Sequence, residues 1–381
     1  IAPGEGQGET AVARAACERL EAHGVRAWLE EAAPGRPNAV AEVGRDGPTL
    51  VFCAHLDTVG TAGMAIPPFE PRVEAGRLYG RGSYDMKGGA AAILAAAAAL
   101  AREALPGRVL LALVADEEYA SAGAEAFLRR HRADAALLAE PSEERLVLAC
   151  KGFVWAELVA RGRAAHGSRW DLGVSAIGRM GRIVAALERF DATELRRRTH
   201  PLLGPASLHC ATIQGGVGLS TYAPDCRLGV ERRTLPGETP DQVAEELARV
   251  VREAGEEAEV RILFHRPPMT CDPAEPVARA VRDAAEAVTG AAPEEAGVAY
   301  WMDGALFAAA GIPTANYGPA GAGAHAAVEW VELDSVVRSA RVLAEAARRF
   351  LRAPRGRRGA DPTRPAGQAE RDLSHGRGAA D

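Results

Sequence analysis

The sequence has few aromatic residues, no closely spaced cysteine pair and no long hydrophobic run. Phe, Trp and Tyr together make up 5% of the 381 residues, while alanine supplies much of the apolar content. A helix-rich α/β protein fits this bias better than a sandwich of short strands. The six cysteines are scattered without a CxxC pair, so we expect reduced thiols rather than a disulfide framework.

The sequence also argues against a membrane protein and against a protein that binds nucleic acid. The longest apolar run, Gly89–Ala101, is too short to span a bilayer. No basic segment followed by an apolar one opens the chain, and the formal net charge of −6 lacks the basic excess of a nucleic-acid binder. We therefore expect a cytoplasmic protein that binds neither membrane nor nucleic acid. Because residue 1 is Ile rather than Met, we also expect that further sequence precedes it.

The first part of the chain alternates short apolar runs with helical patterns. Thr49–Ala54 is apolar throughout, as a central strand covered on both faces should be. Strands alternating with helices predict a layered α/β domain around a central mixed sheet. The remaining elements predicted here are a helix over 8–23, strands over 25–29, 39–43, 108–115 and 135–139, and helices over 88–102 and 122–131.

The pattern changes near Lys151 to strand, helix, strand, strand, helix, strand, which predicts a separate α+β unit. These elements are expected over 153–162, 174–190, 207–213, 226–232, 241–255 and 259–264, with a linker over Phe264–Pro268. The α/β pattern then resumes. At 381 residues the chain exceeds what one core usually supports. We expect a catalytic domain in two parts, 1–152 and 266–352, an inserted lid or dimerisation domain, 153–265, and a disordered tail, 353–381.

Polar residues stand where the predicted strands end. His55 leaves the strand over Thr49–Ala54, and an imidazole there can bind a metal, with Asp57 orienting it. Asp85 lies between glycines just before a helix, where its two oxygens can bridge two cations. Taken singly, His55 and Asp57 are better explained as a structural or surface pair, and Asp85 is better explained as a helix N-cap.

Three further strand ends carry acids or histidine. Glu117 and Glu118 follow the strand over 108–115, and one carboxylate there can bind metal while its neighbour takes a proton from water. Glu140 follows the strand over 135–139. His325 ends a glycine-rich loop that lacks the Lys-Ser/Thr of a phosphate loop, so nucleotide binding is rejected. Solvated surface charge is the alternative for each acid.

The convergence of these sites decides between the alternatives. The carboxyl ends of strands in an open α/β sheet gather at one edge, where active sites form. Two histidines with several carboxylates make a nitrogen and oxygen donor set suited to zinc, with cobalt or manganese also possible. Two such ions roughly 3.5–4 Å apart can share a hydroxide.

The motifs HLDTV, GRGSYDMKGG, ADEE, AEPS and GP…AH…E stand in this order in the chain. In type and order they resemble the family of dizinc amidohydrolases that includes acetylornithine deacetylase, succinyl-diaminopimelate desuccinylase, aminoacylase and glutamate carboxypeptidase. The resemblance spans roughly residues 4–352. It implies that His55 and Glu140 bind one metal ion, that Glu118 and His325 bind the other, and that Asp85 bridges the two.

The resemblance also implies roles around the metals. Glu117 is the general base that activates a water bridging the two ions, and Asp57 holds His55. His166 in the lid helps to polarise the scissile carbonyl, from the partner subunit in dimeric members, and Arg233 receives a substrate carboxylate. A loop histidine and a solvated strand charge are the alternatives for the last two. Thr221 stands where the family often has Asn, which leaves substrate identity open.

The implied function is metal-dependent hydrolysis of the amide bond of an N-acyl amino acid or short peptide by a homodimer with two divalent ions, zinc foremost. A dipeptidase or carboxypeptidase with the same chemistry is one alternative. A non-catalytic binding protein of the same fold is another, although a decayed site should have lost at least one of these residues.

Overall fold

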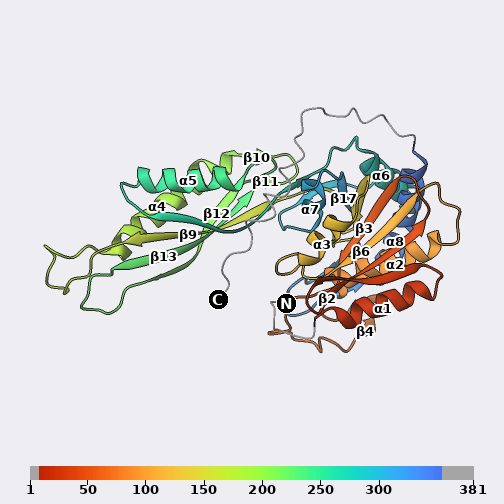
Figure 1. Ribbon diagram of the computed structural model, residues 1–381, viewed down its shortest axis with the longest axis horizontal. Coiled ribbons are helices and arrows are strands. Elements are labelled where there is room, and N and C mark those ends of the chain that lie inside the picture. The colour runs from red at the N-terminus through yellow and green to blue at the C-terminus, as the bar shows by residue number, and fades with distance from the viewer. Residues whose placement is uncertain (1–7, 354–381) are drawn as a thin grey trace. The chain divides into compact units, whose positions relative to one another are not determined.

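The computed structural model describes residues 8–353, which form two compact units (Figure 1). The first unit comprises residues 8–149, 269–297 and 302–353. The second comprises Cys150–Pro268 and Val298–Trp301. The predicted fold class is confirmed, because an α+β unit interrupts a layered α/β unit that has a mixed sheet.

The sheet of the first unit has nine strands, in the order β1-β2-β6-β3-β7-β17-β8-β15, with β16 also paired to β8. The four strands β6, β3, β7 and β17 run parallel to one another. The pairs β1/β2, β2/β6 and β17/β8 are antiparallel. The strands are β1 Arg26–Ala33, β2 Arg36–Gly44, β3 Thr49–His55, β6 Arg108–Val114, β7 Ala135–Leu138, β8 Leu146–Cys150, β15 Met269–Thr270, β16 Glu295–Val298 and β17 Thr314–Asn316.

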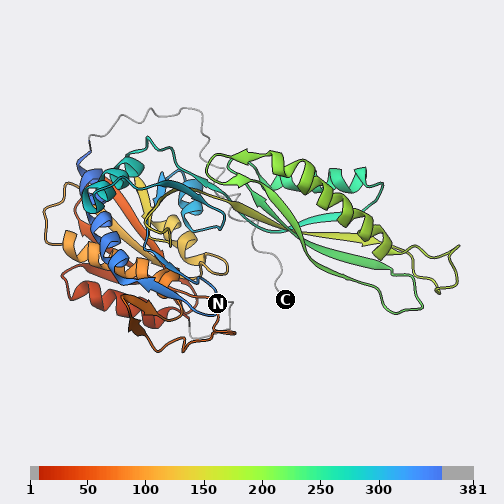
Figure 2. The ribbon, with the colours of Figure 1, turned by 180° about the vertical axis from the view of Figure 1, so that it is seen from behind.

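The central strands are apolar because helices cover both faces of the sheet. Every residue of β3 is buried. In the order of the sheet, β6 lies on one side of β3 and β7 lies on the other, so the chain moves in opposite directions from β3 to β6 and from β6 to β7. Because such crossovers are right-handed, α2 and α3 lie on opposite faces of the sheet. Helices α1 and α8 pack on α2, α6 packs on α8, and α7 packs on α3 (Figures 1 and 2). The helices are α1 Thr10–Glu21, α2 Gly88–Leu100, α3 Ala122–Arg130, α6 Pro276–Thr289, α7 Gly304–Ala309 and α8 Leu333–Arg352.

A small antiparallel sheet in the first unit was not predicted from the sequence. Its order is β18-β19-β5-β4, and its strands are β4 Arg72–Glu74, β5 Arg77–Tyr79, β18 Gly321–Ala322 and β19 Trp330–Glu332. Tyr79 of β5 lies opposite Trp330 of β19. The sheet thereby brings the segment that leads to Asp85 beside the segment that follows His325.

The second unit is a four-stranded antiparallel sheet, β12-β13-β9-β14, with two helices packed against it. Thr239 caps the second helix with a reciprocal capping box to Gln242. The elements are β9 Gly152–Arg161, α4 Ala176–Thr193, η2 Leu195–Arg197, β10 Thr199–His200, β11 Gly204–Pro205, β12 Ser207–Gly215, β13 Asp225–Thr234, α5 Pro240–Glu253 and β14 Glu259–Arg266.

One predicted boundary was wrong. Phe264–Pro268 was expected to be a linker, but β14 continues to Arg266, with Phe264 opposite Trp155. The strand ends at Pro267 and Pro268 because proline has no N–H to donate to the ladder. Of the predicted tail, Ala353 caps α8 and residues 354–381 lie outside the described residues.

Two other expectations concern the whole chain. All six cysteines are free thiols, as the sequence predicts. Among residues 8–353, each helix is too short or too polar to cross a bilayer.

Candidate metal centre

The candidate residues lie where parallel strands of the first unit end. His55 is the last residue of β3, Glu117 and Glu118 follow β6, and Glu140 follows β7. Since these strands run parallel and β3 lies between the other two, their carboxyl ends share one edge of the sheet. His325 reaches this edge from the loop between β18 and β19.

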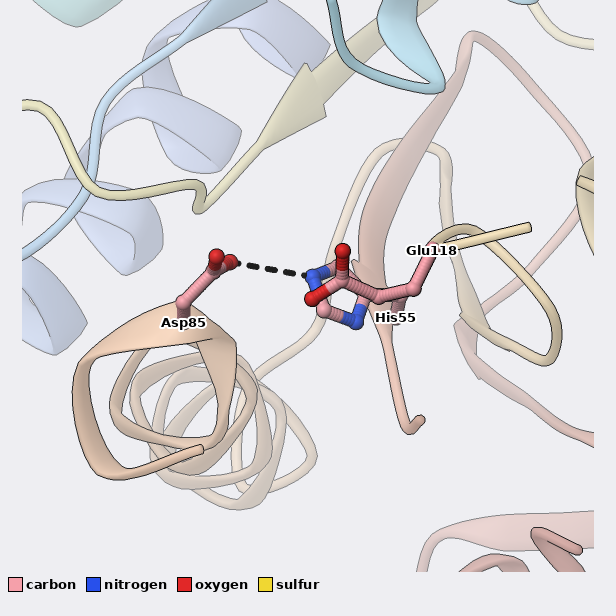
Figure 3. A group of neighbouring side chains, drawn as sticks. All are labelled: His55, Asp85 and Glu118. Carbon is pink, nitrogen blue, oxygen red and sulfur yellow. Dashed lines mark hydrogen bonds and ion pairs between the residues drawn. The ribbon is translucent and has the colours of Figure 1, made fainter. Parts of the chain in front are cut away.

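Asp85 presents its two carboxylate oxygens to two different imidazoles. It lies in the irregular segment η1, Ser83–Lys87, directly before α2, and its peptide bond to Met86 is cis. Its Oδ1 lies 3.2 Å from Nε2 of His55, and its Oδ2 lies 3.1 Å from Nε2 of His325. Figure 3 shows the Asp85 carboxylate facing His55, with Glu118 beside them. A carboxylate in this position can offer one oxygen to each of two cations.

Each imidazole also faces a carboxylate of its own. Oε2 of Glu140 lies 3.9 Å from Nε2 of His55, and Oε2 of Glu118 lies 3.1 Å from Nε2 of His325. Ligand atoms of His55, Asp85 and Glu118 all lie within 4.8 Å of one another. Two donors bound tetrahedrally to zinc, at about 2.0–2.1 Å each, lie about 3.4 Å apart. The spacing and chemistry of these donors therefore fit divalent cations.

The protonation preferences of the cluster show how much negative charge it concentrates. Burial raises the pKa of Glu140 to about 8, and the surrounding carboxylates add to this against the opposing effect of His55. Hydrogen bonds to Asp85 and Glu118 raise the pKa of His325 to about 10. Burial alone would lower the pKa of His55, but nearby carboxylates outweigh it and raise that pKa well above its usual range. Positive charge is favoured here, whether from protons or from metal ions.

Asp57 ties one imidazole to the loop after β6. Nδ1 of His55 lies 3.1 Å from the backbone oxygen of Asp57 and 3.5 Å from its Oδ1. The same carboxylate accepts hydrogen bonds from the backbone N–H groups of Glu117 and Glu118, at 3.2 and 3.1 Å. Burial by itself raises the pKa of Asp57, but the bond to His55 and these contacts lower it to about 2. Asp57 therefore stays ionised and leaves Nε2 of His55 facing the cluster.

Glu117 lies among the same charged side chains. Desolvation raises the pKa of its carboxyl well above the usual range; His55 opposes this, and the carboxylates of Glu140 and Asp303 reinforce it. The preceding residue, Asp116, has a φ of 72°, and His325 has a φ of 60°. A left-handed backbone conformation is unfavourable for residues other than glycine, and residues strained in this way are often found at functional sites.

Comparison with known proteins decides the family. Residues 51–349 match peptidase family M20/M25/M40. The chain belongs to this family. It is also 33% identical over 350 residues to an acetylornithine deacetylase of Myxococcus xanthus, a match that covers 87% of this chain and 90% of the relative. The predicted family is confirmed, and the protein is a metal-dependent hydrolase of amide bonds.

Solved structures share the fold. An aminopeptidase PepT from Bacillus cereus has a TM-score of 0.75 at 20% identity, over 90% of this chain and 93% of that one. The Bacillus subtilis YXEP protein, described as a dinuclear metal-binding peptidase of the M20 family, has a TM-score of 0.71 at 18% identity, over 90% and 92% of the two chains. Both similarities concern the M20 fold.

Sequence reasoning missed three buried charges beside the cluster. Asp303, 1% exposed, stands directly before α7, and its carboxylate raises the pKa values of Glu117 and Glu140. An acid before a glycine that begins a short helix was the available signal. Arg81 and Glu329 form a buried ion pair of 2.7 Å, although both stand in motifs that the sequence analysis quoted.

The two predicted lid residues belong to the second unit. His166 is exposed, its Nδ1 lies 2.8 Å from Oγ of Ser168, and its backbone bridges to Thr221. Arg233 donates to Glu231 at 2.6 Å, and its guanidinium lies over the ring of Phe153. Their roles toward a substrate stay predictions.

Proposed function

We propose that the protein hydrolyses the amide bond of an N-acyl amino acid at a centre holding two divalent cations, zinc foremost and cobalt or manganese as alternatives. One observation carries the proposal: the two oxygens of Asp85 face two imidazoles, each of which also faces its own carboxylate. A structural ion-pair cluster needs no such two-sided arrangement.

The proposed ligands divide into two sets that share Asp85. His55 and Glu140 would hold one cation, and Glu118 and His325 would hold the other. Bound there, divalent cations would supply Lewis-acid polarisation of the amide carbonyl and a lowered pKa for the attacking water. The shared negative charge of the cluster, which raises the pKa of His325 to about 10, favours such occupancy.

Glu117 would act as general base and then as general acid. It takes a proton from the water that attacks the carbonyl carbon, and it delivers that proton to the amine nitrogen as the C–N bond breaks. The products are the carboxylic acid of the acyl group, which then releases its proton, and the free amine. Asp57 supports this chemistry through its bonds to the N–H groups of Glu117 and Glu118, which fix the loop that carries the base.

The substrate class rests on the deacetylase relative. That protein is named for removing an acetyl group, and the two sequences align over most of both chains. Arg233 would receive the substrate carboxylate. The fold of an aminopeptidase favours a dipeptide or short peptide as the second candidate.

A substrate screen tests this proposal. The protein, loaded in turn with zinc, cobalt and manganese, is offered N-acetyl and N-succinyl amino acids and dipeptides. We expect turnover of an N-acyl amino acid, and its loss on chelation with EDTA. Hydrolysis of dipeptides alone would favour the second candidate, whereas activity that survives complete metal removal would contradict both.

The proposed assembly is a homodimer formed through the second unit. β12 ends the order of its four-stranded sheet, so one edge of it is unpaired within that sheet. Exposed apolar side chains accompany this edge: Ile213 on the strand and Ile177 at the start of α4 are 54% and 47% exposed. Unpaired edges and apolar patches are typical of association sites. His166 would then act on the partner's substrate.

The mass of the protein in solution tests this assembly. We expect a dimer at micromolar concentration, and a monomer would contradict action of His166 in trans. The cytoplasmic location stays a prediction from the sequence.

A further inference from the structure

Glu329 is a fully buried carboxylate that collects the backbone around Asp85. Its Oε2 accepts hydrogen bonds from the backbone N–H of Gly82 at 2.9 Å and from Nη1 of Arg81 at 2.7 Å. Its Oε1 accepts from the backbone N–H groups of Tyr84 and Asp85, both at 3.0 Å. One side chain thus fixes three backbone N–H groups of the segment that carries the proposed bridging ligand.

Arg81 extends the same contact to the second loop. It is 7% exposed, and its Nη2 donates to the backbone oxygen of Ala326 at 3.1 Å. Ala326 directly follows His325, the residue whose imidazole lies 3.1 Å from Oδ2 of Asp85. The ion pair therefore holds both residues of this contact. Glu329 binds the backbone of Asp85, and Arg81 binds the backbone of the residue after His325.

Segments about 245 residues apart meet here. The paired strands β5 and β19 bring the two loops side by side, and the backbone N–H of Gly80 donates to the backbone oxygen of Glu329 at 3.2 Å. These contacts fix the stems of the loops. The side chains of Arg81 and Glu329 fix the backbone of Asp85 and of Ala326, the residue after His325.

A buried ion pair is a weak source of stability by itself, because desolvation of the two charges offsets much of their attraction. An apolar pair of similar volume would fill the same space, but it would leave three backbone N–H groups without an acceptor and the Asp85 turn without a fixed position. The arrangement is therefore better explained by orientation of the turn than by stability alone.

We propose that Arg81 and Glu329 are positioning residues that hold Asp85 and His325 at the spacing needed for a shared pair of cations. The inference rests on the proposed function, since it assigns these residues a role toward the proposed metal ligands. Neither residue would touch substrate.

Calorimetric titration of the metal-free protein with Zn²⁺ tests the inference without measuring activity. Glu329→Gln removes the charge and one acceptor, and Arg81→Lys keeps a cation but loses the bond to Ala326. We expect each change to weaken zinc binding by about 10- to 100-fold. The double variant should lose less than the two single effects combined, because the residues act as one unit.

Asp134→Asn is the matched control. Its carboxylate accepts a hydrogen bond from the backbone N–H of Thr49 at 2.9 Å, at the start of β3, whereas His55 is the last residue of that strand. The seven-residue strand separates the two by about 20 Å. This control loses a comparable acceptor and should keep the zinc affinity of the wild type.

The outcomes separate the two proposals. A wild-type protein that binds fewer than two zinc ions contradicts the proposed function itself. If the wild type binds two, and Glu329→Gln and Arg81→Lys bind them as tightly as Asp134→Asn, the positioning role is overturned. Circular dichroism checks folding, and Arg81→Lys, which retains the buried charge pair, carries the test if Glu329→Gln does not fold.

Discussion

The sheet edge of the first unit and the strands of the second unit hold their candidate functional charges in different surroundings. At the sheet edge of the first unit, His55, Glu140 and Glu329 are buried, and left-handed backbone stands at Asp116 and His325. On the second unit Arg232 is buried too, but Arg227 and Arg233 pair with glutamates at partly exposed positions. Exposed pairs contribute little to stability and rearrange easily, whereas buried charges need fixed partners. The buried charges at the first unit's sheet edge are therefore fixed in place, whereas the exposed pairs at Arg227 and Arg233 can rearrange.

The pairs on the second unit illustrate this. Arg227 donates to Glu157 at 3.0 Å across neighbouring strands, and Arg233 donates to Glu231 at 2.6 Å on its own strand. The arginine side chains are 46% and 32% exposed. If the contrast holds, changes at the first unit's sheet edge should abolish chemistry, while changes on the second should alter recognition alone.

The largest effect is expected at Glu117. Glu117→Gln keeps the size and polarity of the side chain but cannot take a proton, so kcat should fall by about 10²- to 10⁴-fold. Steady-state kinetics measures the loss, and elemental analysis should find the metal content unchanged. Turnover at the wild-type rate would remove Glu117 from the proposed mechanism.

Asp57→Asn tests the support beneath the ligands. The amide can still contact Nδ1 of His55, but it lacks the charge that keeps the imidazole in one tautomer. We expect zinc affinity to fall by about 10- to 100-fold, measured by competition with a chromophoric chelator. An affinity equal to that of the wild type would show that the His55 ring is held by other contacts.

Arg233→Ala tests recognition by the second unit. Loss of a hydrogen bond to a charged group is worth about 1.5 kcal/mol or more, so KM for a substrate with a free carboxylate should rise about tenfold or more while kcat changes little. Arg227→Ala, on the same strand and also paired to a glutamate, is the control. Equal effects of the two variants would reduce Arg233 to a general surface charge.

Zinc binding should be sensitive to pH. In the metal-free protein the pKa of Glu140 is about 8 and that of His325 about 10, so both groups hold protons at pH 7. Ligands bind metal in their deprotonated forms, so binding releases those protons. Affinity should therefore rise between pH 6 and pH 8, by about tenfold per pH unit for each proton released. Calorimetry in buffers of different ionisation enthalpy counts these protons, and a flat profile would contradict the shifted values.

The smallest effect is expected at Thr239. Thr239→Ala removes the capping box of α5 and should lower the free energy of unfolding by about 1 kcal/mol. Urea denaturation measures this change. Zinc affinity should stay at the wild-type value. A loss of zinc affinity would mean that the stability of the second unit affects the metal centre of the first.

The sequence predicts the sheet edge well because its signals are local. Thr49–His55 is a continuous apolar run that ends in a histidine, and all of its residues are buried in β3. Glu118 and Glu140 likewise follow apolar runs. Parallel pairing alone then brings these ends together, so a search for polar residues after buried strands finds the cluster.

Other parts depend on contacts between distant segments, which no local pattern encodes. The pairing of β5 with β19 joins runs of only three residues each. The buried pair of Arg81 with Glu329 is invisible until that pairing is known. The end of β14 at Arg266 was missed for a simpler reason, since Phe264-His265-Arg266 stands next to two prolines that suggested a linker.

Anomalous diffraction at the zinc edge from crystals of the zinc-loaded protein tests the central claim most directly. We expect two peaks, one beside each oxygen of Asp85: the first contacted by His55 and Glu140, the second by Glu118 and His325. A single peak, or peaks that Asp85 does not touch, would contradict a two-cation centre built around this carboxylate.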